Sequence, residues 1–317
     1  MTGNSVYNVV AMKDFVGNSA TIKYLEKAVT SGNLSHAYLF CGPGNIGKTK
    51  VAKYFAKLLL CSGENPITCA SCPSCKLFDK GNHPDFFHLD NDSVLVDDVR
   101  ELVGSLDLKP YMGKSKVALI SHAENLTNQA LNSFLKTLEE PNVDTVIILT
   151  TENPKNLLQT IVSRSRMINF SLASEKQIYE LLNGELGVLK AEATIITKLA
   201  AGRPGVATSL SIDPEIVSEI TSLARDFNRI YRSTDIYEKI SYADKLSKDK
   251  EMLGSKLSNL ELAARAELIN EKLTLSNKTK VNDLVKMIDG IARSREMIAA
   301  NANAKLVVES LLLGSIV

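Results

Sequence analysis

One glycine-rich segment has the residue types and spacing of a phosphate-binding loop. It lies between an apolar run at residues 37–41 and a helical pattern of apolar residues at 51–59. Its glycines let successive backbone N–H groups face one anion, on which the positive end of the following helix would also act. The lysine and threonine that end the loop would reach the outer phosphates of ATP and hold a magnesium ion. A chance match is the alternative. The predicted nucleotide-binding residues are Gly42, Pro43, Gly44, Asn45, Ile46, Gly47, Lys48 and Thr49.

Four of the five cysteines have the spacing C-x7-C-x2-C-x2-C directly after that helical pattern. Four thiolates suit tetrahedral zinc, and a set without an open position indicates a structural ion. Scattered buried cysteines are the alternative, but prolines and polar residues here indicate a loop with little apolar cover. The predicted zinc ligands are Cys61, Cys69, Cys72 and Cys75. Cys41 lies within an apolar run, and we expect it in the core.

The segment after residues 116–120 lacks the carboxylates that a hydrolysing phosphate-loop enzyme needs. Such an enzyme places one acidic residue at a strand end to hold magnesium and a second to polarise the attacking water. This chain has Ser121 and His122 there, so its own ATP hydrolysis should be weak or absent. The alternative is that Glu124 or His122 acts instead, although Glu124 stands two or three residues too late unless the chain bends.

Two pairs of charged residues stand in unusual places. Glu139 and Glu140 end a predicted helix, where the helix dipole disfavours negative charge. This indicates a functional or interface role, with a solvated helix end as the alternative. Arg164 and Arg166 stand beside the start of an apolar strand, and an arginine donated across a subunit boundary can stabilise a transferring phosphate.

The elements that would position these residues alternate between strands and helices up to about residue 170. Two of the expected strands are continuous apolar runs, as is typical of strands covered on both faces. This order predicts an α/β domain with a doubly wound parallel sheet. The expected strands span residues 37–41, 86–89, 117–120, 146–149 and 167–170.

Beyond residue 170 the strand signal disappears and helical patterns take over. A small helical unit is expected at 171–212, with a turn at the sequence AGRPG (201–205), and a helical bundle at 213–317. We therefore predict α/β plus all-α architecture in three domains, 1–170, 171–212 and 213–317. The metal module, 61–75, is inserted in the first domain.

Composition limits the partners and the compartment. Lys and Arg number 37 and Asp and Glu 36, which leaves a net charge of +1 and no global basic field for autonomous nucleic-acid binding. The first five residues lack a basic targeting pattern, and no apolar stretch is long enough to span a membrane. We expect a cytoplasmic protein with no membrane partner.

Taken together, the motifs resemble those of the AAA+ clamp-loader subunits of bacterial DNA polymerase III. The resemblance implies an AAA+ P-loop domain, a small helical lid domain and a C-terminal helical collar domain used for oligomerisation. The residues that carry it are HAYLF (36–40) with the loop, the four cysteines, LKTLEEP (135–141), Ser163-Arg164-Ser165, and Asn301 and Asn303 with Leu306 and Glu309.

Two subunit types of this family are candidates, the ATP-hydrolysing gamma/tau type and the delta-prime type. Ser121 and His122 replace an acidic pair that gamma/tau subunits keep. The AGRPG segment also lacks an arginine three residues beyond Gly202, where gamma-type chains carry a nucleotide sensor. The chain also stops soon after residues 301–309, which resemble a motif of the family's collar domain, and these features favour the delta-prime type.

The resemblance also implies roles for single residues. Arg164 matches an arginine finger that acts in trans on a neighbouring ATP site, within Ser-Arg-Ser where the family has Ser-Arg-Cys. Asn153 falls in the sensor-one region, and the four cysteines match zinc ligands. The expected partners are gamma/tau and delta subunits in a hetero-pentamer, and through it the sliding clamp and primed DNA. An active AAA+ ATPase of gamma/tau type and a helical scaffold with a vestigial loop are the alternatives.

Overall fold

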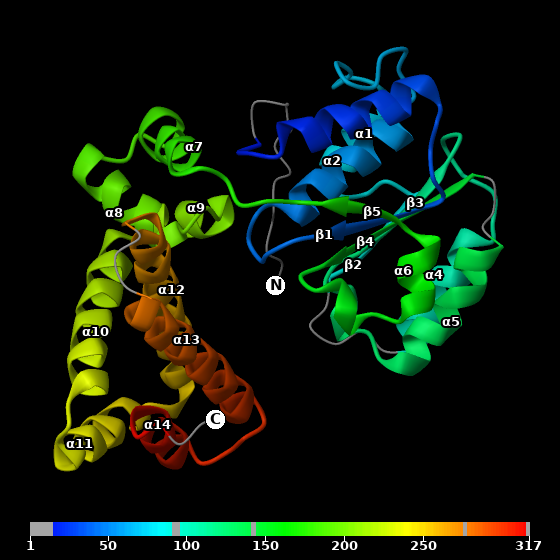
Figure 1. The fold of residues 1–317 in the computed structure, drawn as a ribbon. Helices are drawn as coiled ribbons and strands as arrows, with labels where there is room; N and C mark the ends of the chain where they lie inside the picture. Colours follow the sequence, from blue (N-terminus) through cyan, green and yellow to red (C-terminus); the bar gives the residue numbers. More distant parts are fainter. Residues whose placement is uncertain (1–14, 91–95, 141–143, 275–277, 315–317) are drawn as a thin grey trace. The chain divides into compact units, whose positions relative to one another are not determined.

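The chain, a computed structural model, separates into two compact units, Met1–Ala173 and Ser174–Val317 (Figure 1). The structure describes residues 15–90, 96–140, 144–274 and 278–314, without the side chains of Asn128 and of residues 270–280. The first five residues and Pro141, used above, lie outside these ranges. The division into three domains stays a prediction.

Strands and helices alternate along the first unit, as the sequence predicts. Its elements are α1 (Ser19–Ser31), β1 (Ala37–Cys41), α2 (Lys48–Leu60), α3 (Pro73–Asp79), β2 (Phe86–Leu89), α4 (Val96–Leu106), β3 (Lys116–Ile120), α5 (Asn128–Glu139), β4 (Thr145–Thr151), α6 (Gln159–Arg164) and β5 (Arg166–Asn169). Short 3-10 turns, Ala123–Asn125 and Pro154–Asn156, follow β3 and β4.

The five strands form one parallel sheet in the order β2-β3-β4-β1-β5. The predicted doubly wound parallel sheet is therefore confirmed. β4 extends beyond the predicted 146–149, because the buried Thr150 and Thr151 continue the strand. Threonine is β-branched and suits a strand, and the Thr150 hydroxyl accepts a hydrogen bond from the His122 N–H at 3.2 Å.

Side chains of β1 alternate between two cores, one on each face of the sheet. Tyr38 and Phe40 pack with residues of α1 and α2. Ala37, Leu39 and Cys41 pack on the opposite face with residues of α4 and α5. Figure 1 shows α1 and α2 on one side of the sheet and α4, α5 and α6 on the other. Cys41 is 4% exposed, which confirms it as a core residue.

The cysteine-rich segment differs from the expected loop with little apolar cover. Residues Pro73–Asp79 form the helix α3, with Cys72 as its N-cap and Pro73 in its first turn. Pro fits the first helical position because it has no N–H to leave unpaired. Cys75 is 1% exposed, and Phe78 belongs to the core beside α2. The end of this segment, from Cys72 onward, is therefore anchored to the α/β core, and the prediction of a loop was wrong there.

The second unit is helical. Its elements are α7 (Glu175–Tyr179), a π-helical turn (Glu180–Glu185), α8 (Lys190–Ala200), α9 (Pro204–Ile212), α10 (Pro214–Arg232), α11 (Ile236–Ser247), α12 (Lys250–Thr274), α13 (Lys278–Ala299) and α14 (Ala304–Leu312). Ala201 and Gly202 have positive φ angles of 50° and 79°, and Pro204 starts α9, so the predicted turn is confirmed.

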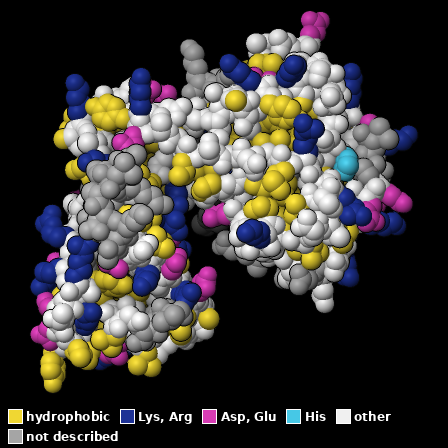
Figure 2. Space-filling view, in the orientation of Figure 1, with side chains coloured by type: hydrophobic (Ala, Val, Ile, Leu, Met, Phe, Trp, Pro, Cys, Tyr) yellow, Lys and Arg dark blue, Asp and Glu magenta, His cyan; other side chains and the backbone are white. Residues whose placement is uncertain are grey.

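The helices α10 to α14 share one apolar core. Asn303 caps α14 by accepting from the backbone N–H groups of Lys305 and Leu306. On the face shown in Figure 2, basic and acidic side chains are interspersed over this unit. Among the described residues, no helix combines the length and the apolar character needed to span a bilayer.

Candidate nucleotide and metal sites

The glycine-rich loop joins the carboxyl end of β1 to the start of α2, the setting that the sequence predicted. Gly42 has a φ of 152°, and a Cβ there would lie 2.6 Å from the carbonyl oxygen of Phe170. Gly47, with a φ of 92°, is the N-cap of α2. Glycine is needed at both positions, because the first is a close approach of two backbones and the second has left-handed backbone.

The side chain of Lys48 folds back onto the backbone of the loop. The Nζ atom of Lys48 donates to the carbonyl oxygens of Gly42 and Pro43 at 2.7 and 2.8 Å. The residue is 6% exposed, and Thr49 follows it half-buried in the first turn of α2. The ammonium group and the N-terminus of α2 therefore place positive charge at one loop, an arrangement that can hold phosphate groups.

The segment after β4 places a carboxylate against the loop. A Cβ on Gly44 would collide with the Oε1 atom of Glu152, so this exposed side chain lies against the loop backbone. Asn153, which the resemblance places in the sensor-one region, is also exposed. Its Oδ1 atom accepts from the Lys155 N–H at 3.0 Å and caps the 3-10 turn there.

The end of β3 carries a hydroxyl and an imidazole where a hydrolysing enzyme carries carboxylates. Ser121 is 1% exposed, and its Oγ atom lies 2.9 Å from the Nε2 atom of His88, at the end of β2. His122 is exposed and has a φ of 51°. Sequence reasoning missed His88, because only the sheet pairs the ends of β2 and β3.

The backbone of His122 is left-handed and bends the chain after β3. Such a bend is what the sequence required for Glu124 to approach the glycine-rich loop. The Glu124 Oε1 atom accepts from the Glu152 N–H at 3.2 Å. Its Oε2 atom is buried and has no hydrogen-bond partner among the described residues. Because Glu152 itself abuts Gly44, the bend brings the Glu124 carboxylate to the same edge of the sheet as the loop.

Arg164 is the last residue of α6, and its NH2 atom forms an ion pair with the Oε1 atom of Glu139 at 2.8 Å. Its NH1 atom donates to the carbonyl oxygen of Thr160 at 3.2 Å. Arg166 points elsewhere, since its guanidinium carbon lies 5.2 Å from the centre of the Tyr24 ring. The structure therefore joins two motifs that the sequence presented separately, the end of α5 and the end of α6.

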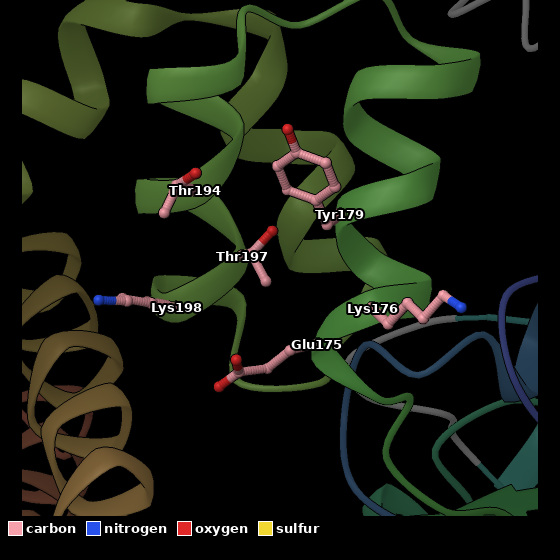
Figure 3. Close-up of a pocket in the computed structure, with 6 residues that line it drawn as sticks. All are labelled: Glu175, Lys176, Tyr179, Thr194, Thr197 and Lys198. Carbon is pink, nitrogen blue, oxygen red and sulfur yellow. The ribbon is translucent and has the colours of Figure 1, made fainter.

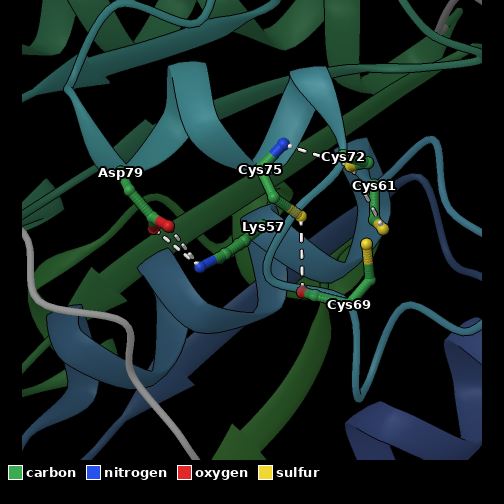
Figure 4. A network of polar contacts seen from close by, with 6 residues as sticks. All are labelled: Lys57, Cys61, Cys69, Cys72, Cys75 and Asp79. Carbon is green, nitrogen blue, oxygen red and sulfur yellow. Dashed lines mark hydrogen bonds and ion pairs between the residues drawn. The ribbon is translucent and has the colours of Figure 1, made fainter.

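The four cysteines of the predicted metal site come together in space, and Figure 4 shows their sulfur atoms close to one another. All four Sγ atoms lie within 4.8 Å of one another, and those of Cys61 and Cys72 are 3.9 Å apart. A tetrahedron with zinc–sulfur bonds of about 2.3 Å has edges of about 3.8 Å. The cluster could therefore hold a metal ion, and its size fits zinc.

Burial raises the pKa of two thiols of the cluster, Cys61 to about 11 and Cys75 as well, whereas hydrogen bonds lower the pKa of Cys72. The Sγ atoms of Cys61 and Cys72 accept from the N–H groups of Gly63 and Cys75, each at 3.3 Å. Burial acts to raise the pKa of Cys72, but hydrogen bonds from Ser62 and from the Cys75 N–H outweigh it and lower that pKa to about 5. A Cβ on Gly63 would lie 2.6 Å from the Cys69 Sγ atom, so the turn admits only glycine without rearrangement.

Polar contacts tie this module to the α/β core. The Nζ atom of Lys57 on α2 lies 2.6 Å from the Oδ1 atom of Asp79 at the end of α3 (Figure 4). The Ser74 hydroxyl donates to the Leu60 carbonyl at 2.5 Å and lies 2.8 Å from the Nε2 atom of His83. These contacts fix α3 on α2 and so fix two of the four cysteines.

A surface pocket of about 260 Å³ lies in the second unit and includes none of the predicted site residues. Figure 3 shows that Lys176 and Lys198 point away from one another on its two sides. Its lining is Glu175, Lys176, Tyr179, Thr194, Thr197 and Lys198.

The sheet order and the loop between β1 and α2, followed in the chain by a helical unit, define this chain as an AAA+ P-loop protein. Residues 17–174, about half of the chain, match the family model described as DNA polymerase III, delta subunit. The chain belongs to the AAA+ family that contains the clamp-loader subunits of DNA polymerase III.

Three relatives illustrate the range of this family. The tau/gamma subunit of Haemophilus influenzae is 34% identical over 67% of this chain and 33% of that protein. The delta-prime subunit of Bacillus subtilis is 37% identical over 51% of this chain and 50% of that protein. The delta-prime subunit of Pseudomonas aeruginosa is 42% identical over 41% of each. The chain spans half or less of the length of these curated relatives.

Proposed function

We propose that this chain is a delta-prime type subunit of a DNA polymerase III clamp loader. The observation that carries this choice is the end of β3, where Ser121 and His122 stand in place of the acidic pair of gamma/tau subunits and the Ser121 hydroxyl lies against the His88 imidazole of β2. The hydroxyl of Ser121 and a neutral imidazole cannot hold magnesium and polarise water as two carboxylates do. The chain would therefore serve a neighbour's ATP site rather than hydrolyse ATP rapidly itself.

In this role Arg164 is the arginine finger that acts in trans. It stands at the end of α6 with 36% of its side chain exposed, so a neighbouring phosphate can reach it. A guanidinium placed there would stabilise the charge that develops during phosphoryl transfer. The loop of residues 42–49 and Asn153 would bind ATP with magnesium, and the four cysteines would hold one structural zinc ion.

The helices α10 to α14, within residues 213–317, would act as the collar that joins this chain to gamma/tau and delta subunits in a hetero-pentamer. Long helices packed around one core supply the surfaces that such a ring needs. The complex, rather than the nearly neutral chain alone, would engage the sliding clamp and primed DNA in the cytoplasm.

The decisive test measures DNA-stimulated ATP turnover in the complex reconstituted with gamma/tau and delta subunits. Arg164→Ala should leave assembly intact and lower turnover, because the neighbouring site loses its finger, whereas Arg166→Ala should change it little. Equal turnover in the Arg164→Ala and unaltered complexes would remove the basis for the finger role. The isolated chain should bind ATP through Lys48 and release little phosphate.

A second candidate function, an active ATPase of gamma/tau type, is favoured by the bent segment that brings Glu124 to the loop edge. In that case the isolated chain would hydrolyse ATP steadily, and both Lys48→Ala and Glu124→Gln would abolish turnover. Loss of hydrolysis in Glu124→Gln with ATP affinity retained would establish this function in place of the first.

A further inference from the structure

The ends of α5 and α6 meet at one charged contact. Glu139 is the last residue of α5 and Arg164 the last residue of α6, and the two helices lie against one another (Figure 1). A carboxylate at a helix C-terminus is disfavoured by the helix dipole. The ion pair at 2.8 Å offsets that cost, which explains why an acidic residue stands at this position.

The contact leaves the guanidinium able to bind a phosphate. An arginine side chain has five N–H donors. The contacts with Glu139 and with the Thr160 carbonyl involve one terminal nitrogen each, so donors remain for an anion. The two contacts also fix the plane of the guanidinium. An arginine side chain without such contacts samples many rotamers.

The support for this contact is rigid. Phe134 and Leu138, on the last two turns of α5, are 0% and 1% exposed in the core under the sheet. Ile161 of α6 is 1% exposed in the same core. Glu139 therefore projects from a fixed helix end, and Arg164 is held against it by an equally fixed neighbour.

We propose that Glu139 is a positioning residue that holds the Arg164 guanidinium in the orientation in which it meets the neighbouring subunit's phosphate. This proposal rests on the finger role proposed above. Glu140, the next residue, makes no ion pair with any residue that the structure describes, although it has the same charge and stands one position away. The adjacent carboxylates thus provide a matched pair in which only one touches the finger.

The experiment measures the Arg164-dependent turnover, which is the turnover of the reconstituted complex minus that of the complex with Arg164→Ala. Glu139→Ala should lower this quantity by about three- to tenfold, because the arginine is no longer pre-oriented. Glu140→Ala should leave it unchanged. Glu139→Gln, which keeps an oxygen at the same reach, should restore part of it.

A double variant separates positioning from general destabilisation. When Arg164 is already alanine, Glu139→Ala should have no further effect on turnover, since it acts only through the arginine. A further loss in that background, or equal effects of Glu139→Ala and Glu140→Ala, would overturn the proposal and leave the finger role intact. No effect of Arg164→Ala itself would instead remove the proposed function.

Discussion

The Nε2 atom of His88 lies 2.9 Å from the Oγ atom of Ser121, across the paired ends of β2 and β3. The His88 side chain is 15% exposed. Burial, helped by the positive charge of Lys53, lowers the pKa of His88 to about 4, against the opposing effect of Asp90. The imidazole is therefore neutral at pH 7, and the edge of the sheet beside the nucleotide loop carries no charge at these two positions.

This burial predicts a pH dependence of stability. The pKa of His88 is lower in the folded chain than the ordinary value of about 6.5, so the unfolded chain binds its proton first. The contribution of the neutral His88 to the free energy of unfolding is fully present above pH 6.5, and it is lost as the pH falls toward 4. Urea unfolding should show about 1 kcal/mol less stability from His88 at pH 5.5 than at pH 7.

The variant His88→Gln should lose this part of the pH dependence, whereas His122→Gln, which alters an exposed histidine, should keep it. The pKa of His83 is also lowered by burial, so the comparison between variants, and not the curve of the unaltered chain, isolates His88. Identical pH curves for His88→Gln and the unaltered chain would contradict the assignment.

Two glycines of the loop should respond differently to alanine. Gly42→Ala should destabilise the chain by about 1–3 kcal/mol, because its Cβ meets the backbone oxygen of Phe170 and its φ is positive. Gly44→Ala should cost less than about 1 kcal/mol, since its Cβ meets only the movable end of the exposed Glu152 side chain. Denaturant unfolding of the two variants at pH 7 measures the difference, and equal losses would count against the loop geometry.

A substitution in the turn of the metal module should weaken metal binding even though all four cysteine ligands remain. Gly63→Ala should lower the zinc content per chain, because its Cβ would lie 2.6 Å from the Cys69 sulfur and displace that ligand. Metal analysis with Cys72→Ser as the positive control measures this. Chelation should disorder residues 61–72 but keep the sheet, since Phe78 holds α3 in the core. Loss of the α/β circular dichroism on chelation would contradict that separation.

In the helical bundle, Glu261 on α12 joins two helices through arginines. Its carboxylate accepts from Arg265 at 2.7 and 2.8 Å and from Arg295 of α13 at 2.7 Å. Glu261→Gln should destabilise the chain by about 1–2 kcal/mol at pH 7, as hydrogen bonds to charged groups weaken. Glu296→Gln, an exposed change on α13, should have little effect in the same thermal or urea unfolding assay.

The stabilisation by Glu261 should decrease as the pH falls. Burial acts to raise the pKa of Glu261, but hydrogen bonds and charge from Arg265 and Arg295 outweigh it, so that the pKa lies below its usual value near 4.5. Its stabilising contribution is therefore complete above pH 4.5 and is lost at lower pH. The difference between Glu261→Gln and the unaltered chain should shrink as the pH falls below 4.5, and a difference that grew would be inconsistent with this ion pair.

The sequence by itself determined the local elements that carry the chemistry. The loop at 42–49, the cysteine spacing and the bounds of β1 and β2 could be predicted because each depends on residues that are close in the chain. Glycines that permit positive φ, apolar runs and a lysine at the start of a helix specify their own local geometry.

Only the tertiary structure decided which distant residues meet. The pairing of β2 with β3 brings His88 to Ser121, and the packing of α6 on α5 brings Arg164 to Glu139. The helix α3 was not predicted, because its sequence contains a proline and polar residues, whereas in the structure Cys75 is buried and Phe78 packs in the core beside α2. Contacts between elements depend on strand order and helix packing, which local pattern and propensity do not encode.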